Sequence, residues 1–148
     1  MKPFLLDTNV ISELRKSKSR IDANVLIWAQ GLDIESCFLS VISLYELEKG
    51  IFLLEQKDPE QAAGLAEWFE GIREVEFRGR ILAIDANIAS KAASMQSTGP
   101  KPMLDTFIAA TALEHNMIIA TTNSQDFIDT GATLVNPWEP GSPISVMM

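Results

Sequence analysis

The sequence predicts an α/β domain with a parallel β-sheet. Short apolar runs alternate with longer amphipathic stretches along the chain, which is the pattern of strands connected by helices. The length of 148 residues is typical of one domain, and such a domain buries about two-thirds of its unfolded surface, enough for a core without disulfides. We expect one domain over residues 1–138 and a disordered tail over residues 139–148, which contain two prolines and a glycine.

Five apolar runs are expected to form the strands, and they comprise residues 4–6, 37–41, 81–84, 117–120 and 133–135. Stretches with helical periodicity predict helices over residues 9–16, 44–56, 86–95 and 103–115. Asp22 is expected to cap a further helix that continues through Ala29, and Pro59 to begin another, because proline is favoured in the first helical turn. Asn116 is expected to end the last helix by taking the left-handed conformation.

The composition excludes several classes of function. One cysteine, Cys37, allows neither an intramolecular disulfide nor a cysteine-rich zinc site. A net charge of −8 argues against a protein that coats nucleic acid by neutralising phosphates. The early charge at the N-terminus and the lack of any apolar run of about 20 residues predict no signal peptide and no membrane span, and hence a cytoplasmic protein.

A basic run follows the first acidic motif, and it comprises Arg15, Lys16, Lys18 and Arg20. Such a run is usually a solvated loop. Its position beside Asp7 also allows it to face RNA, because local cations can supply the positive field that an acidic protein otherwise lacks.

Four carboxylates are the candidates for chemistry, and each also has a structural interpretation. Asp7 follows a predicted strand, where ligands bind in parallel sheets, but it is also placed to cap the next helix. Glu46 lies in the pattern Ser43-x-x-Glu46, which is typical of a helix capping box. Asp126 follows the predicted strand over residues 117–120, and its alternative role is to stabilise a turn.

Asp105 gives the strongest indication of a functional site. It lies in the first turn of a helix whose other residues are nearly all apolar, so this helix is expected to be buried. A buried carboxylate is unfavourable unless it is paired or bound to a metal. A position near a helix N-terminus stabilises a carboxylate by only about 0.3–1 kcal/mol, which is too little to explain burial.

We expect the carboxylates to meet at one edge of the sheet. Two carboxylates about 5 Å apart repel by roughly 3 kcal/mol at an effective dielectric near 20, so four in one cleft require protons or a divalent cation. Oxygen ligands without a second histidine or a second cysteine favour Mg²⁺ or Mn²⁺ over zinc. The sequence therefore predicts that the catalytic and metal-binding residues are Asp7, Glu46, Asp105 and Asp126.

Four motifs occur in order along the chain: Leu5-Leu6-Asp7-Thr8-Asn9-Val10, Tyr45-Glu46-Leu47-x-x-Gly50, Leu104-Asp105-Thr106-x-Ile108-Ala109-Ala110 and Thr122-Asn123-x-x-Asp126-Phe127. Together they resemble the PIN-domain ribonucleases, and in particular the FitB-like branch of the VapC toxins of bacterial toxin–antitoxin pairs. The segment Val135-Asn136-Pro137-Trp138 is similar to the closing strand of that branch. The resemblance extends from about Phe4 to Trp138.

The resemblance implies a PIN-like three-layer α/β/α sandwich with a five-stranded parallel sheet. It also implies a Mg²⁺-dependent endoribonuclease that forms homodimers, acts on structured RNA and is inhibited by a cognate antitoxin, the toxin of a type II toxin–antitoxin system. Asp7, Glu46 and Asp105 match the acidic triad of the family. The fourth position departs from the pattern, because many members carry an acid at the position of Asn123, so Asp126 is the candidate for the fourth acid.

The expected mechanism is metal-assisted hydrolysis of a phosphodiester, in which the acidic triad holds one Mg²⁺ that activates a water. A second ion about 3.5–4 Å away would stabilise the leaving oxygen. The hydroxyls of Thr8 and Thr122 are candidates for binding metal-bound waters. Two alternatives stay open: an aspartate-nucleophile phosphatase or phosphoacceptor domain that uses Asp7, although Asn9 stands where such enzymes place a second aspartate, and a catalytically inactive binding partner.

Overall fold

The computed structural model describes residues 2–143 and confirms the predicted parallel sheet. Its five strands are β1 (Phe4–Leu6), β2 (Cys37–Ser40), β3 (Ile81–Leu82), β4 (Ile118–Ala120) and β5 (Thr133–Val135). Every neighbouring pair is parallel, and the strand order is β3-β2-β1-β4-β5. β1 is therefore the central strand.

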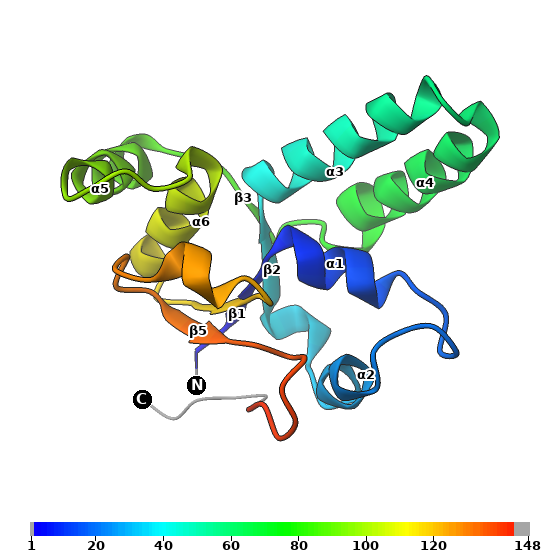
Figure 1. Cartoon of the computed structure of the whole chain (residues 1–148), viewed down its shortest axis with the longest axis horizontal. Helices are drawn as coiled ribbons and strands as arrows, with labels where there is room; N and C mark the ends of the chain where they lie inside the picture. Colours follow the sequence, from blue (N-terminus) through cyan, green and yellow to red (C-terminus); the bar gives the residue numbers. More distant parts are fainter. Residues whose placement is uncertain (1, 144–148) are drawn as a thin grey trace.

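The described residues form six α-helices: α1 (Thr8–Leu14), α2 (Ala23–Gln30), α3 (Val41–Glu55), α4 (Pro59–Gly71), α5 (Ala86–Ser97) and α6 (Met103–Glu114). α5 and α6 lie on one side of the sheet, and the other helices lie on the opposite side (Figure 1). α3 and α4 pack together as a hairpin that extends beyond the sheet (Figure 1). α4 continues into a π-helical turn, η2 (Ile72–Glu76), and short 3₁₀ turns are η1 (Ile34–Ser36) and η3 (Ser124–Phe127). This arrangement is the expected three-layer α/β/α sandwich.

The sheet separates two apolar cores, because successive residues of a strand point to opposite faces. Phe4 and Leu6 belong to the core under α1 and α2, where the Phe4 ring meets Trp28 edge-on at a centroid distance of 5.4 Å. Leu5 belongs to the core under α5 and α6, together with Ile108. Both faces of the sheet are covered, which is why the strands appear in the sequence as continuous apolar runs.

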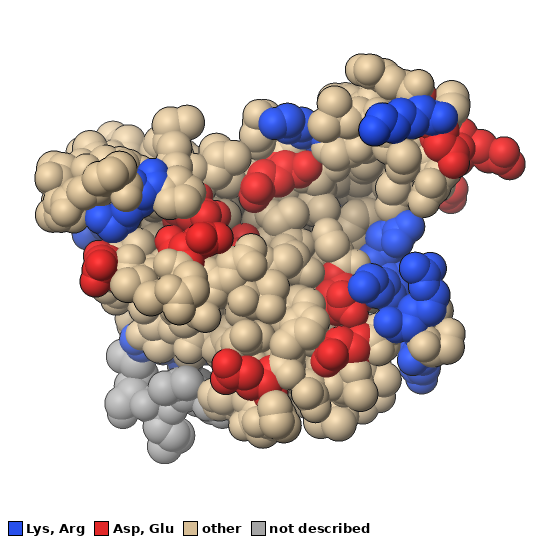
Figure 2. All heavy atoms as spheres, in the orientation of Figure 1, with Lys and Arg blue, Asp and Glu red and all other residues tan. Residues whose placement is uncertain are grey.

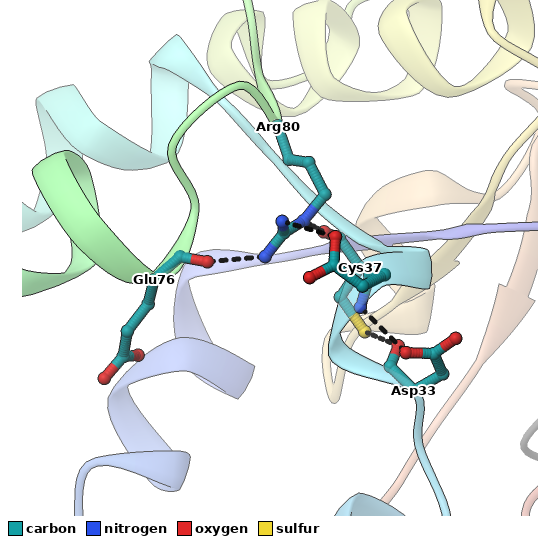
Figure 3. Close-up of polar contacts among 5 residues, drawn as sticks. Asp33, Cys37, Glu76 and Arg80 are labelled. Carbon is teal, nitrogen blue, oxygen red and sulfur yellow. Dashed lines mark hydrogen bonds and ion pairs between the residues drawn. The ribbon is translucent and has the colours of Figure 1, made fainter.

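Arg80 follows η2 and is hydrogen-bonded both to η2 and to the beginning of β2 (Figure 3). Its Nε donates to the carbonyl oxygen of Cys37 at 3.0 Å, and its guanidinium also donates to the carbonyl oxygen of Glu76 and to the carboxylate of Glu35. Cys37 is buried, and burial raises the pKa of its thiol to about 11. The thiol therefore stays protonated and has a structural role.

The predicted capping box at Ser43 and Glu46 is wrong. α3 begins at Val41, directly after β2, and Ser40 is its N-cap, with Oγ accepting from the N–H of Ile42 at 3.0 Å. β2 ends at Ser40, which has extended backbone angles, and α3 begins at the next residue, so no loop separates them. Glu46 consequently lies beyond the first turn, where its side chain is not needed for capping. The predicted left-handed stop after α6 is confirmed, since Asn116 has a φ of 55°.

The described part of the predicted tail is hydrogen-bonded to the domain. The Ser142 hydroxyl contacts the carbonyl oxygens of Asn136 and Glu139, and the indole N–H of Trp28 donates to the carbonyl oxygen of Pro143 at 2.9 Å. Residues 144–148, where the rest of the disorder was predicted, lie outside the described residues. Among the described helices, none combines the length and the hydropathy that crossing a bilayer requires.

Candidate active site

The candidate site lies at the carboxyl edge of the sheet, where the chain changes direction. From β1 the chain proceeds to β2 and β3 on one side, and it then returns to β4 on the other side of β1. Such a switch point is where open α/β sheets bind their ligands. Asp7 directly follows β1, and its backbone N–H donates to the carbonyl oxygen of Ala120 at the end of β4, at 2.9 Å.

Asp7 is buried and firmly held, with 4% of its surface exposed. Its Oδ1 accepts from the backbone N–H of Thr8 at 2.8 Å, so Asp7 does cap α1 as its structural interpretation predicted. Its Oδ2 accepts from the Thr121 hydroxyl at 2.8 Å and from Nδ2 of Asn9 at 3.1 Å. Burial raises the pKa of the Asp7 carboxyl, these hydrogen bonds oppose the rise, and the negative charge of Asp126 adds to it.

Glu46 is connected to the same region through Thr8. The Thr8 hydroxyl donates to Oε1 of Glu46 at 2.8 Å, and its oxygen lies 3.2 Å from the hydroxyl of the buried Ser43. This contact joins the beginning of α1 to α3. Of the two threonines singled out in the sequence, Thr8 thus contacts a candidate ligand, whereas Thr122 is exposed and engages Asn9 through its backbone N–H.

Asp105 lies half-buried in the first turn of α6. Burial is the largest of the effects that raise its pKa to about 6, and it is followed by the negative charges of Asp7, Asp126 and Glu46. The negative charges of the other three predicted carboxylates therefore act on Asp105, although the four residues come from four distant segments. Asp126 itself lies exposed on η3.

No cation of residues 2–143 is in ion-pair contact with this cluster. The ion pairs found among residues 2–143 join other partners, and none includes Asp7, Glu46, Asp105 or Asp126. Figure 2 shows acidic side chains on either side of the hollow between α3 and the α5–α6 pair. Carboxylates in such a position favour protons or an external cation.

The described residues contain no three acidic, histidine or cysteine side chains already close enough to ligate one metal ion. Ligation of one ion by Asp7, Glu46 and Asp105 therefore stays a prediction. The donor chemistry fits a hard divalent cation, because every candidate ligand is a carboxylate oxygen.

A polar network holds the loop that precedes Asp105. α6 has no side-chain N-cap, but Nε2 of Gln96 donates to the Thr106 hydroxyl at 2.8 Å and to the carbonyl oxygen of Lys101 at 3.0 Å. The Lys101 ammonium in turn donates to the carbonyl oxygens of Met95 and Gly99. The network fixes the first turn of α6, and with it the backbone of Asp105, relative to α5.

Thr121 and Asn9 are site residues that the sequence analysis did not assign. Thr121 is fully buried, and its oxygen accepts from the backbone N–H of Asn123 at 3.0 Å while its hydroxyl donates to Asp7. One signal was present in the sequence: Thr121 follows β4 directly, as Asp7 follows β1. Residues at equivalent ends of neighbouring parallel strands point into the same cleft.

Comparison with known families identifies the fold. A family model described as the PIN domain matches residues 4–132. The chain belongs to the PIN-domain family. The resemblance inferred from the four sequence motifs is thereby confirmed.

Relatives of this PIN domain align over nearly its whole length. VapC ribonuclease Y4jK of Sinorhizobium fredii is 33% identical over 142 residues, which cover 93% of this chain and 99% of that protein. Toxin FitB of Neisseria gonorrhoeae is 34% identical over 140 residues, covering 91% of this chain and 98% of that protein. A solved structure of FitAB bound to an IR36 DNA fragment superposes with a TM-score of 0.81 at 33% identity, covering 92% of this chain and 96% of that chain.

Proposed function

We propose that this protein is a PIN-domain endoribonuclease that hydrolyses RNA phosphodiester bonds with a divalent cation, Mg²⁺ or Mn²⁺. The observation that carries the proposal is the group of four carboxylates at the switch point of the sheet, whose negative charges add to burial in raising the pKa of Asp105 and which form no ion pair among residues 2–143. Relatives named as a VapC ribonuclease and as toxin FitB support the same activity.

We assign Asp7, Glu46 and Asp105 as ligands of the cation and Asp126 as the fourth acid of the cleft. A divalent cation bound there would neutralise charge on the phosphate and activate the attacking water. The chain itself supplies orientation: the Thr121 hydroxyl and Nδ2 of Asn9 hold Oδ2 of Asp7, so this carboxylate needs little reorganisation during the reaction.

The protein is further proposed to be the toxin of a type II toxin–antitoxin pair that acts in the cytoplasm. FitB was solved in the FitAB complex, and several neighbours in structure are toxin–antitoxin complexes. An antitoxin that places a basic side chain in the uncompensated acidic cleft would compete with both the cation and RNA. A homodimer is expected by analogy with the family.

The two alternatives receive less support. A phosphatase of the dehalogenase type needs a proton-transferring acid two residues after its nucleophile, and this chain has Asn9 there. The carboxamide of Asn9 transfers no proton and is hydrogen-bonded to Asp7 and to the N–H of Thr122. An inactive binding partner is separated from a nuclease by the cleavage experiment below.

The proposal is tested by incubating the purified protein with total RNA in Mg²⁺, in Mn²⁺ or in chelator. We expect cleavage in either metal, none in chelator, and loss of cleavage in Asp7→Asn and in Asp105→Asn. Asp129→Asn is the matched control, because Asp129 is an exposed acid after η3 that does not contribute to the raised pKa of Asp7 or Asp105. Cleavage that survives both site substitutions would remove the proposal.

A further inference from the structure

We propose that a groove beside the candidate active site binds the RNA nucleotide next to the cleaved bond, with Arg15 holding its phosphate and Trp68 contacting its base. The inference rests on the proposed function, because it takes RNA as the substrate. It concerns residues outside the acidic cluster.

The groove lies between α1, α3 and α4 and has a volume of about 380 Å³. This volume is within the range of about 300–1,000 Å³ that is typical of ligand sites. The residues that line it include Thr8, Ser12, Arg15, Glu46, Gly50 and Trp68. Thr8 and Glu46 also belong to the candidate active site, so the groove continues directly from the acidic cluster.

Arg15 provides a phosphate-binding group at the far end of the groove. Thr8, Ser12 and Arg15 are four and three residues apart, so they share one face of α1, and Arg15 lies about 10 Å along the helix axis from Thr8. Figure 2 shows the basic side chains gathered over the segment between α1 and α2. A guanidinium binds phosphate through parallel hydrogen bonds.

The charge of Arg15 is uncompensated, in contrast to that of its neighbour. Arg15 is exposed and forms no ion pair among residues 2–143, whereas the Lys16 ammonium is paired with Glu13 at 2.9 Å. The Arg15 guanidinium instead lies over the Trp68 ring, 5.9 Å from its centroid. In a chain of net charge −8, this free cation beside the acidic cluster is suited to an anionic ligand that spans both.

Trp68 and its neighbours provide a surface for a base. Trp68 is half-buried, packs against the core under α1 and α2, and also lines the groove together with Leu47 and Leu65. Single-stranded RNA is bound by splaying bases onto aromatic side chains and arginine planes, which is the pair that Arg15 and Trp68 form.

Gly50 keeps the floor of the groove open. It lies inside α3, where glycine destabilises a helix relative to alanine, yet a Cβ built there meets no atom within 4 Å. No contact among the described residues therefore explains why this position has no side chain. A ligand lying against α3 would occupy the space that a side chain here would fill.

The first test fills the groove with Gly50→Leu and measures cleavage of a short labelled RNA strand in Mg²⁺. We expect KM to rise by about tenfold or more while kcat changes by less than about threefold, because binding beside the reaction centre is lost and the acidic cluster is kept. Gly64→Leu is the matched control: Gly64 lies in α4 with equally open surroundings and does not line the groove. Both changes favour the helix, so folding is retained.

The second test measures binding of the same RNA strand in chelator, in an Asp105→Asn background, over a range of salt concentrations. We expect Arg15→Ala to weaken binding and to reduce the slope of log K against log salt by about 0.7, the effect of one phosphate contact on a single strand. Lys16→Ala is the control and should leave the slope unchanged. A merely structural role of Arg15 would not alter the slope.

Unchanged KM in Gly50→Leu together with an unchanged salt slope in Arg15→Ala would overturn the inference. It is also wrong if these variants leave RNA kinetics intact but weaken binding of the purified cognate antitoxin, since the groove then binds protein. If the wild-type protein binds the RNA strand without cleaving it, the proposed function fails, and the binding measurements alone decide the groove.

Discussion

Thr121 is the side chain on which the geometry of Asp7 most depends. Its hydroxyl donates to Asp7, and its oxygen accepts from Nδ2 of Asn9 and from the backbone N–H of Asn123. It is fully buried, so no water replaces these contacts if the hydroxyl is removed. The position of the Asp7 carboxylate thus depends on a residue at the end of a different strand.

We predict that Thr121→Val, which keeps the shape and removes the hydroxyl, lowers the free energy of unfolding by about 1–3 kcal/mol, because buried polar groups lose their partner. RNA cleavage should fall as well, since Asp7 loses a donor. Urea denaturation and cleavage assays measure the two effects. Thr122→Val is the control in the denaturation measurement, because the exposed Thr122 side chain makes no hydrogen bond among the described residues. Equal losses in both variants would contradict the assignment.

Asp105 leads to a prediction on pH. Its pKa is raised from 3.8 to about 6, so the folded state binds the proton more tightly than the unfolded state. The contribution of this tighter proton binding to the free energy of unfolding is therefore complete below pH 3.8 and is lost as the pH rises to about 6. We expect Asp105→Asn to raise the Tm of the metal-free protein at neutral pH.

Calorimetry in chelator at several pH values checks this prediction. The difference in Tm between Asp105→Asn and the wild type should be small below pH 3.8, widen up to about pH 6 and then stay constant. Asp129→Asn should show no such widening. A difference that does not vary with pH, or a variant that is less stable at neutral pH, would argue against a crowded anionic cleft.

At the level of elements, apolar runs, helical periodicity and the residues that begin helices predict the five strands and six helices of the described chain in their order. The beginning of α3 is where the prediction fails. The pattern Ser43-x-x-Glu46 favours Ser43 as the cap, and the apolar run places Ser40 within the strand over residues 37–41, whereas in the structure Ser40 is the N-cap.

The corrected cap leads to a prediction on helix stability. Ser40→Ala should lower the free energy of unfolding by about 1 kcal/mol, because the N–H of Ile42 loses its acceptor. Urea denaturation measures the change, and the m-value should stay the same. If Ser40→Ala had no effect while Ser43→Ala destabilised the protein together with Glu46→Gln, the capping box would be restored.

The candidate site could be predicted in part, because strand ends place residues at a common edge. That rule locates Asp7 and the segments that carry Glu46 and Asp126. It also applies to Thr121, but this residue lies just outside the family motif, which begins at Thr122. The relations that define the site, such as the contact of Thr8 with Glu46, depend on side-chain positions that periodicity does not contain.

At the level of the whole molecule, charge is distributed unevenly on an acidic surface. The acidic hollow lies beside the α3–α4 hairpin, and the basic side chains gather over the adjacent segment between α1 and α2 (Figure 2). With a net charge of −8, the protein attracts RNA poorly by its overall field. A bound cation and Arg15, which forms no ion pair among residues 2–143, would together provide the positive potential that a phosphate backbone needs.

The central claim is that the carboxylates jointly bind a divalent cation, and calorimetric titration of Mn²⁺ or Mg²⁺ into the purified protein tests it most directly. The account predicts saturable binding to the wild type, loss of that binding in Asp7→Asn and Asp105→Asn, and unchanged binding in Asp129→Asn. Absence of saturable binding to the wild type, or equal binding by the Asp7 and Asp105 variants, would contradict it.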